Sequence, residues 1–498
     1  MTQPCDLSAS EARRLIGSGA LSPVELTLSC LARIELLNPT LNAIVTLAED
    51  RALEEAELAA KAVVRGDSLG LLHGLPVAVK DLHATEGIVT TYGSSFYRDH
   101  VPSEDAGIVA RIRSAGGIVI GKTNIPEMSI GANTINRLFG ATGNPYATDL
   151  TCGGSSGGSA VAVATGMAPL ATGSDHGGSL RIPACFSGVV GHRATPGTVP
   201  HEDRTITQTN YSLQGPIARN IVDAGLLLAT IARRDRNSRK DPMAFPLDVG
   251  AFLEPSQIDI SSLKIGVTTD FGGLLVSNHV RNEFRQRVEV LENAGAEVSD
   301  LSLDLCDALD VDWQLRADVF ATQYHRQIEH FDDTFNPNVF RTYKTALSTT
   351  VLEIAKARRR QIELFQAVDA VFDDVDLLIC PGVSVPPFPW TSLYPTEIDG
   401  ESIDNYMAWL GLTACLTVVG HPVVALPAGL DALQLPFGIQ CVGPMYRDAA
   451  LLGMARGIEE CFGRFDLTQP PKPDVAAIAK TDPQCRELGR LAAVAAAK

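Results

Sequence analysis

Two short stretches of the chain place serines among glycines, a combination that can support nucleophilic chemistry. The first serine loop spans residues 153–159, and the second serine loop spans residues 173–184. Glycine allows positive φ angles and close approach to the backbone, so each loop can expose a hydroxyl among free N–H groups. Attack on a carbonyl needs such a hydroxyl, a base that activates it, and N–H donors for the developing oxyanion. The two loops therefore predict a catalytic site.

The segment between the two loops explains how they can meet. Residues 160–166 have the small apolar character of a buried helix that ends at Gly166, and residues 168–172 are typical of a short buried strand. A helix followed by a returning strand carries the second loop back beside the first. Ser155 and Ser179, 24 positions apart in the sequence, can in this way become neighbours in space.

Lys80 is the candidate base. It ends an apolar strand predicted at residues 76–79, and a lysine is almost never fully buried unless it has a partner or a function. Burial disfavours the ammonium form, so it can lower the pKa from about 10.4 until the neutral amine accepts a proton near neutral pH. Alternatively, the side chain reaches solvent or pairs with Asp81.

The order and spacing of these residues resemble the amidase signature family of serine hydrolases. The match takes in both serine loops, the lysine that ends the apolar strand, and the run at residues 188–191. It extends over nearly the whole chain, from about Leu7 to about Cys461.

The resemblance implies a division of roles among these residues. Lys80 would be the base, Ser155 would pass the proton and would follow an unusual cis peptide bond, and Ser179 would be the nucleophile. The oxyanion hole would consist of the backbone N–H groups of His176, Gly177, Gly178 and Ser179. This chemistry needs no cofactor and no metal ion.

Three further polar residues flank the predicted catalytic groups. Ser156 follows the bridging serine directly, and Asp175 and Arg181 lie on either side of the predicted nucleophile. We expect them to support the two turns. Arg181 has a second interpretation, because its guanidinium group could instead meet an anionic substrate.

Candidate pocket residues come from two segments. The long polar connection at residues 124–144 leads into the first serine loop, and loops of this length usually line a site, which makes Met128 and Asn133 candidates. Residues 380–407 are rich in proline and aromatic residues, and Trp390 is expected to form a rigid hydrophobic wall there. Core packing is the alternative role for Trp390. A hydrophobic wall predicts a small neutral substrate with an alkyl or aryl group.

Two other motifs need to be read in their structural context. Residues 153–157 satisfy G-x-S-x-G, so an α/β-hydrolase esterase with Ser155 as nucleophile is an alternative. That motif needs a strand running straight into it, and residues 144–151 instead form a polar loop.

Residues 116–123 satisfy the phosphate-binding pattern G-x-x-x-x-G-K-[ST]. Because residues 118–120 are strand formers, we predict a strand there and no nucleotide site.

Local signals also locate a long helix near the N-terminus. Ser22, Pro23 and Glu25 provide a capping box with proline at the first helical position. Asn38 and Pro39 predict the end of this helix, since the residue before a proline disfavours the helical conformation.

The wider pattern alternates apolar strands with helices and predicts an α/β fold. Its central sheet is expected to be mixed and largely parallel, with helices covering both faces. We predict one domain over residues 1–469, with a helical lobe inside residues 296–379, and a peripheral tail at residues 470–498.

Composition limits the kinds of partner. The chain has 498 residues and a formal net charge of -17 without a basic run, which argues against nucleic acid. No uncharged stretch approaches the roughly 18 residues of a membrane span, and the ten cysteines lack zinc or redox spacing. We expect a cytoplasmic enzyme with reduced thiols that acts on a small-molecule amide, with no membrane partner and a homodimer as its candidate assembly.

The expected reaction is hydrolysis of the C–N bond of a linear amide through a serine acyl-enzyme, with esterase activity as a side reaction. The resemblance admits a second activity as well. Amidotransferase A-type subunits share the family core and release ammonia from glutamine within a tRNA-dependent complex. Partners that co-purify with the chain would separate the two activities.

Overall fold

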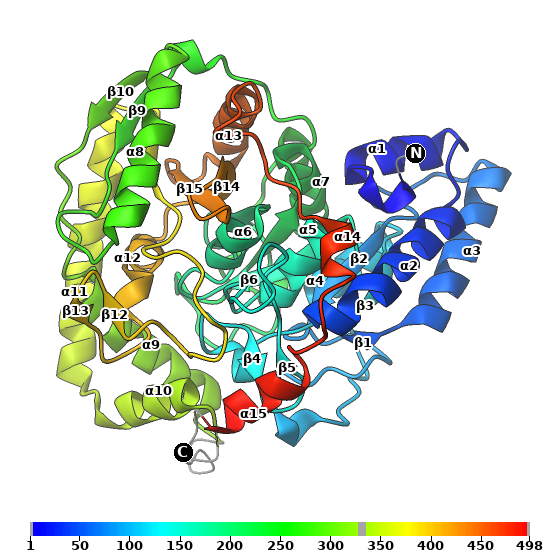
Figure 1. The fold of residues 1–498 in the computed structure, drawn as a ribbon, viewed down its shortest axis with the longest axis horizontal. Helices are drawn as coiled ribbons and strands as arrows, with labels where there is room; N and C mark the ends of the chain where they lie inside the picture. Colours follow the sequence, from blue (N-terminus) through cyan, green and yellow to red (C-terminus); the bar gives the residue numbers. More distant parts are fainter. Residues whose placement is uncertain (1–2, 327–334, 496–498) are drawn as a thin grey trace.

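An eleven-stranded mixed sheet runs through the computed structural model, which describes residues 3–326 and 335–495 (Figure 1). The strands lie side by side in the order β1 (Ile44–Leu47), β3 (Ile118–Thr123), β2 (Pro76–Lys80), β6 (Leu170–Asp175), β8 (Leu213–Ala218), β7 (Val190–Arg193), β14 (Val423–Leu430), β15 (Pro436–Val442), β11 (Leu377–Pro381), β9 (Lys264–Val267) and β10 (Glu297–Asp300).

Parallel pairing occurs in two blocks of this sheet. One block is β3–β2–β6 and the other is β11–β9–β10. Antiparallel pairs join the strands between the blocks and add β1 at one edge. The predicted mixed sheet is confirmed, with its parallel pairs confined to these two blocks.

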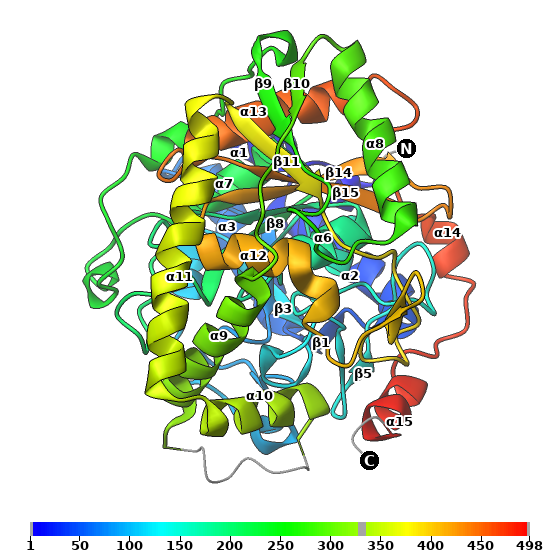
Figure 2. The same ribbon diagram turned by 90° about the vertical axis from the view of Figure 1, so that its left-hand side faces the viewer.

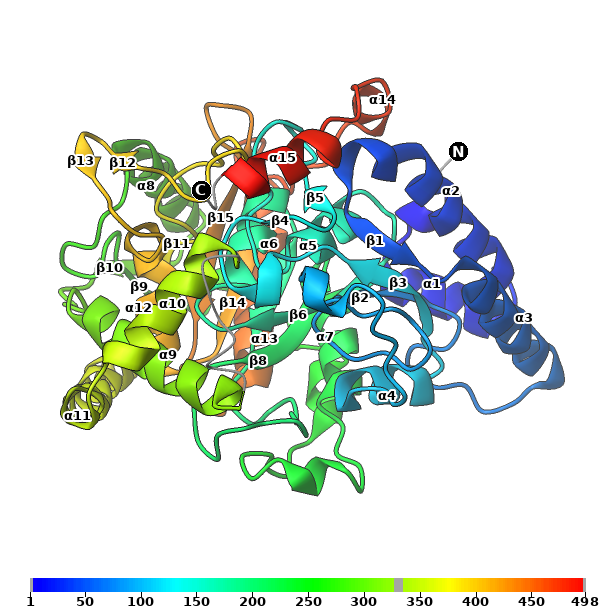
Figure 3. The same ribbon diagram turned by 90° about the horizontal axis from the view of Figure 1, so that it is seen from below.

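Helices cover both faces of the sheet, as predicted. Helices α5 (Gly157–Ala164) and α6 (Arg181–Ser187) pack on each other and on the central strands. Helices α7 (Ile221–Ile231) and α13 (Asp448–Phe462) also pack on each other and on central strands. Figure 3 shows α5 and α6 on one side of β6 and β8, with α7 and α4 (Gly107–Ser114) on the other side.

A group of helices lies beside the β11 half of the sheet (Figure 2). Helices α10 (Pro337–Ser348) and α11 (Val351–Asp369) both pack on α9 (Ala308–Tyr324). Helix α9 also packs on α12 (Gly411–Val419), while α8 (Asn278–Asn293) packs on β10 and β11. This arrangement brings α9 close to the second serine loop.

The N-terminal helices lie on the β1 side of the molecule, and the C-terminal segment runs from there toward α10 (Figure 1). Helix α14 packs on α2, and α15 packs on a small hairpin formed by β4 and β5. No helix in the described part of the chain is long and apolar enough to cross a membrane. The bounds of these elements are α1 (Ala9–Gly17), α2 (Pro23–Leu41), α3 (Glu49–Arg65), β4 (Ile135–Asn136), β5 (Gly140–Ala141), α14 (Val475–Ile478) and α15 (Glu487–Ala495).

Helix α2 begins at its predicted capping box, but the predicted end at Asn38 and Pro39 is wrong. The helix continues through Pro39 to Leu41, and Asn42 ends it in the left-handed region with φ 52°. The Asn38 side chain accepts a hydrogen bond from the N–H of Ala43 at 2.8 Å. This bond closes the helix terminus from inside the last turn.

The segment with the phosphate-binding pattern is strand β3, as predicted, and all six of its residues are buried. Its Lys122 Nζ donates to Thr85 Oγ1 at 2.6 Å, to Thr90 Oγ1 at 3.0 Å and to the carbonyl of His83. The lysine therefore holds the connection that follows β2 and does not face a ligand.

Candidate active site

Lys80 ends β2 with its amine fully buried. Its Nζ lies 2.8 Å from Ser155 Oγ, 2.9 Å from Ser156 Oγ and 2.9 Å from Ser174 Oγ. Burial lowers the pKa of Lys80 well below its ordinary value, against the opposing effect of Asp175. Each hydroxyl can donate or accept, so three hydroxyls satisfy a neutral amine, and no carboxylate of the described residues pairs with it.

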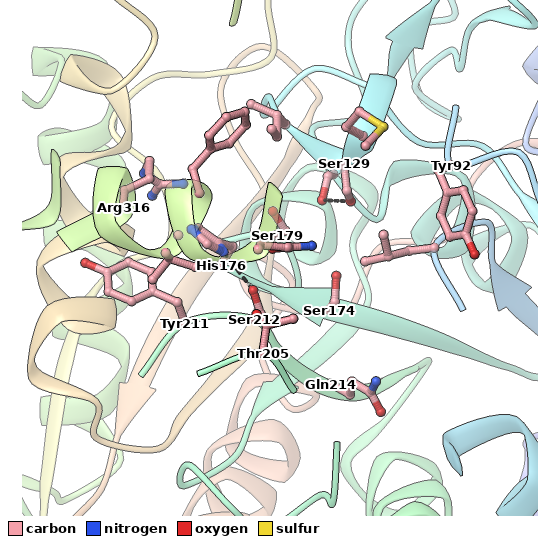
Figure 4. A pocket seen from close by; sticks show the side chains of 18 of the residues that line it. Tyr92, Ser129, Ser174, His176, Ser179, Thr205, Tyr211, Ser212, Gln214 and Arg316 are labelled. Atoms are coloured by element: carbon pink, nitrogen blue, oxygen red, sulfur yellow. Dashed lines mark hydrogen bonds between the residues drawn. The ribbon is translucent and has the colours of Figure 1, made fainter. Parts of the chain in front are cut away.

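The first serine loop presents Ser155 to two donors. The peptide bond between Gly154 and Ser155 is cis. Ser155 Oγ accepts from Lys80 Nζ, and Ser129 Oγ donates to the same oxygen at 2.8 Å (Figure 4). Thr134 Oγ1 donates to the carbonyl of residue 153 at 2.7 Å, which holds the loop from the side of the long connection.

Asp175, the last residue of β6, organises the second serine loop. Its carboxylate accepts from the N–H groups of Gly178 at 2.9 Å and Leu180 at 3.1 Å. Arg181 and Arg193 pair with the same carboxylate at 2.9 Å and 3.1 Å. Burial alone would raise the pKa of Asp175, but the two guanidinium groups outweigh it and hold that pKa below its usual range. Arg181 is fully buried by these contacts, so it supports the turn and does not reach a substrate.

The N–H groups of the second serine loop fall into two sets. That of Gly178 is bonded to the carboxylate at the end of β6, so it is not available to an oxyanion as the resemblance implied. Those of His176, Gly177 and Ser179 have no acceptor among the residues that the structure describes. Gly178 has φ 124°, and a Cβ there would lie 2.4 Å from Thr413 Oγ1, so only glycine fits the turn.

Both loops open into one cavity of about 470 Å³, within the usual range for ligand pockets (Figure 4). The N–H of Ser156 donates to the carbonyl of Ser179 at 3.3 Å and joins the two loops. Ser155, Ser174 and Ser179 all border the cavity, and Ser179 is the most exposed of the three predicted catalytic residues. The apolar lining includes Tyr92, Tyr97, Met128, Ile130, Phe320 and Tyr324. The polar lining includes His176, Asp203, Arg204, Gln214 and Arg316.

The His176 imidazole also borders the cavity. Its Nδ1 is hydrogen-bonded to Ser212 Oγ at 2.9 Å, and its ring lies 4.9 Å from that of Tyr211. Burial lowers the pKa of His176 well below its ordinary value, and the nearby Arg316 lowers it further. The ring is therefore neutral at neutral pH.

The amidase family model matches residues 25–452. The chain belongs to the amidase family. An acylamidase of Rhodococcus erythropolis is 30% identical to it over 460 residues, which cover 91% of this chain and 95% of that protein. The A-type subunit of the glutamyl-tRNA(Gln) amidotransferase of Alkaliphilus metalliredigens is 31% identical over 460 residues, with 87% and 92% covered. The crystal structure of a bacterial aryl acylamidase of the amidase signature family has a TM-score of 0.85 at 27% identity, with 95% and 99% covered. These likenesses support amide hydrolysis.

Of the three pocket residues predicted in this amidase, Met128 borders the cavity. Asn133 is buried, and its Nδ2 donates to the carbonyl of Trp390 at 2.9 Å. Trp390 is not part of the cavity lining, because its ring packs in a separate cluster with Ile135 and Cys485. The predicted hydrophobic wall at Trp390 is therefore wrong, and the alternative of core packing describes it.

Three polar residues of this amidase lie at the site without having been identified from the sequence. Ser174 belongs to the second serine loop, where its proximity to Lys80 depends on how β2 and β6 pair. Ser129 follows Met128 in the long connection, and both have positive φ angles, 62° and 53°. Arg316 lies on α9. Nothing in the sequence around it distinguishes it from an arginine on the exposed face of a helix.

Proposed function

We propose that this chain hydrolyses the C–N bond of a carboxylic amide through a serine acyl-enzyme, with Ser179 as nucleophile, Ser155 as proton relay and Lys80 as base. One observation carries the proposal. The buried Lys80 amine lies 2.8 Å from Ser155 Oγ and pairs with no carboxylate of the described residues, and Ser155 borders the same cavity as Ser179. A lysine in such a place is a base in its neutral form.

The proposed proton path runs from Ser179 through Ser155 to Lys80, and its last step uses the 2.8 Å contact between Ser155 Oγ and Lys80 Nζ. Ser179 Oγ attacks the amide carbonyl and passes its proton to Ser155, while Ser155 passes its own proton to Lys80 Nζ. The carbonyl oxygen becomes an oxyanion, which the N–H groups of His176, Gly177 and Ser179 can stabilise. When the tetrahedral intermediate breaks down, the protons return along the same path to the leaving amine. Water then hydrolyses the acyl-enzyme with the same three residues.

The lining of the cavity is consistent with a substrate that is a small neutral amide with an alkyl or aryl group. The apolar lining includes residues of the connection after β2, the Ser129 segment and α9, and the predicted wall at residues 380–407 contributes Tyr406 but not Trp390. Burying each methylene group is worth about 0.8 kcal/mol. We therefore expect the preference for larger apolar substrates to depend on Phe320 and Tyr324.

The amidotransferase A-type activity is the second candidate, because the A-type subunit of one such complex is 31% identical to this chain. The two functions differ in what the purified chain does alone. Hydrolysis of simple amides by the chain without partners would favour the free amidase. An α/β-hydrolase site has less support, since the side-chain partners of Ser155 in the described part of the chain are Lys80 and Ser129 and include no histidine.

A covalent probe tests the proposal directly. A fluorophosphonate should label Ser179, and peptide mass spectrometry should recover the label on that residue. Ser179→Ala should abolish both labelling and amide hydrolysis. Label recovered on Ser155 would instead favour the esterase alternative.

A further inference from the structure

A buried arginine lies on the second serine loop, beside the proposed nucleophile. Arg316 belongs to α9 and is 8% exposed. A Cβ on Gly177 would lie 2.5 Å from Arg316 Nη2, so the guanidinium group packs directly on the turn. Figure 4 shows Arg316 and Tyr211 on one side of Ser179 and Tyr92 on the other. The arginine therefore forms one end of the cavity.

The guanidinium group is held in place from one edge. Arg316 Nε and Nη2 donate to Asp312 Oδ2 at 3.2 Å and 3.1 Å, one helical turn earlier on α9. Tyr211 Oη donates to the other oxygen of Asp312 at 3.0 Å, and the tyrosine ring lies 5.9 Å from the guanidinium carbon. Three contacts thus fix the orientation of a side chain that is normally flexible.

The remaining nitrogen of this group has no such partner. Arg316 Nη1 has no hydrogen-bond acceptor among the described residues, and the side chain borders the cavity. Arg316 Nη1 is not one of the buried atoms that lack a partner, so it is open to the cavity and a group inside the cavity can reach it. A group that occupies the cavity is in a position to supply this acceptor.

The charges around the cavity determine what kind of acceptor fits. Asp312 balances Arg316, and Asp241 balances the other lining arginine, Arg204, at 2.9 Å. Asp203 also borders the cavity and adds a negative charge. A substrate carboxylate would lose its hydration and meet no unpaired cation among the described lining residues. A neutral oxygen needs no such charge.

The geometry points to Arg316 Nη1 as the binding site for a neutral oxygen acceptor of the substrate, a ketone, amide or ether oxygen other than the carbonyl under attack. This inference rests on the proposed amidase activity and deepens it. The substrate class becomes neutral amides that carry a second polar oxygen, and Arg316 becomes the residue that selects them.

Two matched substrate pairs test this role. In each pair, an acetyl group replaces an isopropyl group of nearly the same shape. The pairs are para-acetylbenzamide with para-isopropylbenzamide, and para-acetylacetanilide with para-isopropylacetanilide, so the oxygen lies in the acyl part or in the amine part. The measured quantity is the ratio of kcat/KM within each pair, compared between wild type and Arg316→Met. This comparison cancels the intrinsic reactivity of each substrate.

A hydrogen bond to a charged donor predicts that Arg316→Met lowers the acetyl-to-isopropyl ratio by at least about 10-fold in one of the two pairs. The double variant Arg316→Met with Asp312→Asn removes both charges, so no buried carboxylate is left unpaired, and it should show the same loss. Arg358→Met is the matched control, because this exposed arginine of α11 contacts α9 through Asp318 and lies outside the cavity lining. It should leave both ratios unchanged.

If Arg316→Met changes the acetyl-to-isopropyl ratio of kcat/KM by less than about 10-fold in both pairs, the proposed role of Arg316 in binding the second oxygen is overturned. If para-carboxybenzamide is a better substrate than para-acetylbenzamide and Arg316→Met removes that preference, the site is one for anions and the neutral class is wrong. Failure of wild type to hydrolyse any of these amides would overturn the proposed function itself, together with this role.

Discussion

The chemistry of Lys80 depends on its surroundings, as a second buried lysine shows. Lys122 lies on the neighbouring strand β3, and burial lowers its pKa to about 7 against the opposing effect of Asp81. Its amine donates to a backbone carbonyl and two threonines of the connection after β2, none of which is a nucleophile. Lys80 instead meets three serine hydroxyls, and two of them, those of Ser155 and Ser174, border the cavity. Two lysines with similar burial therefore differ in what their amines touch, which supports the proposed role of Lys80 as the base.

Lys80→Met should lower kcat/KM by roughly 10²- to 10⁴-fold, the usual contribution of a general base. The folded pKa of Lys80 is lowered, so the active neutral amine is lost as the pH falls through that pKa. Wild-type kcat/KM should therefore rise with pH over a limb that lies below the ordinary lysine range. The variant should lack this limb.

The control for this substitution is Lys61→Met on α3, since Lys61 is an exposed lysine that pairs with Glu57. It should retain the wild-type profile. A Lys80→Met enzyme that keeps most of the activity and the same limb would show that another group is the base.

Ser129→Ala should lower kcat by about 2- to 10-fold and leave KM nearly unchanged. The reason is that Ser129 donates to Ser155 Oγ at 2.8 Å, and a neutral hydrogen bond contributes about 0.5–1.5 kcal/mol. Steady-state kinetics on one amide would measure both constants. Ser114→Ala at the end of α4 is the control, because its hydroxyl donates only to the carbonyl of Arg111. An unchanged kcat would remove Ser129 from the proton relay.

The shape of the second serine loop depends on Gly178. Gly178→Ala places a Cβ 2.4 Å from Thr413 Oγ1 at φ 124°, so the turn must shift or the residue must remain strained. Backbone strain of this kind costs about 1–3 kcal/mol. We expect a lower free energy of unfolding in urea and slower labelling of Ser179 by a fluorophosphonate.

Gly400→Ala is the matched control for this turn. Gly400 also has a positive φ, 87°, but a Cβ there meets nothing within 4 Å. This variant should lose some stability and keep the wild-type rate of labelling. Wild-type labelling of Gly178→Ala would mean that the turn does not determine the position of Ser179.

Elements whose signals are local were predictable from the sequence, and contacts between distant segments were not. The capping box of α2 and the apolar run of β3 depend on neighbouring residues, so both were predicted correctly. The prediction that Trp390 lines the pocket was wrong because the sequence does not show that Cys485, in the chain's tail, packs on it. The predicted end of α2 was wrong by a few residues. The helix passes through Pro39, and the Asn38 side chain closes its terminus after Leu41.

At the scale of the whole molecule, the ion cluster at Asp175 joins parts of the sheet that are far apart in sequence. Arg193 comes from β7, while Arg181 Nη1 also donates to the carbonyl of Thr413 in α12 at 3.0 Å and to Gln440 of β15 at 2.9 Å. The sequence predicted a mixed sheet, but the order of strands depends on which distant segments pair. The cluster stabilises one such order around the second serine loop.

Asp175→Asn should therefore lower the free energy of unfolding by about 3–5 kcal/mol, because it leaves two buried guanidinium groups without their carboxylate. Arg181 and Arg193 hold the folded pKa of Asp175 below its unfolded value of about 3.9. The stabilisation is thus fully present above that pH and is lost as the pH falls through the folded pKa.

Urea unfolding should show a constant difference between wild type and variant from about pH 7 to about pH 4, and a smaller difference in stronger acid. Asp67→Asn, which removes an exposed partner of Arg65, should change little. A difference that shrinks already between pH 7 and pH 5 would show that another group, and not Asp175, dominates the acid sensitivity.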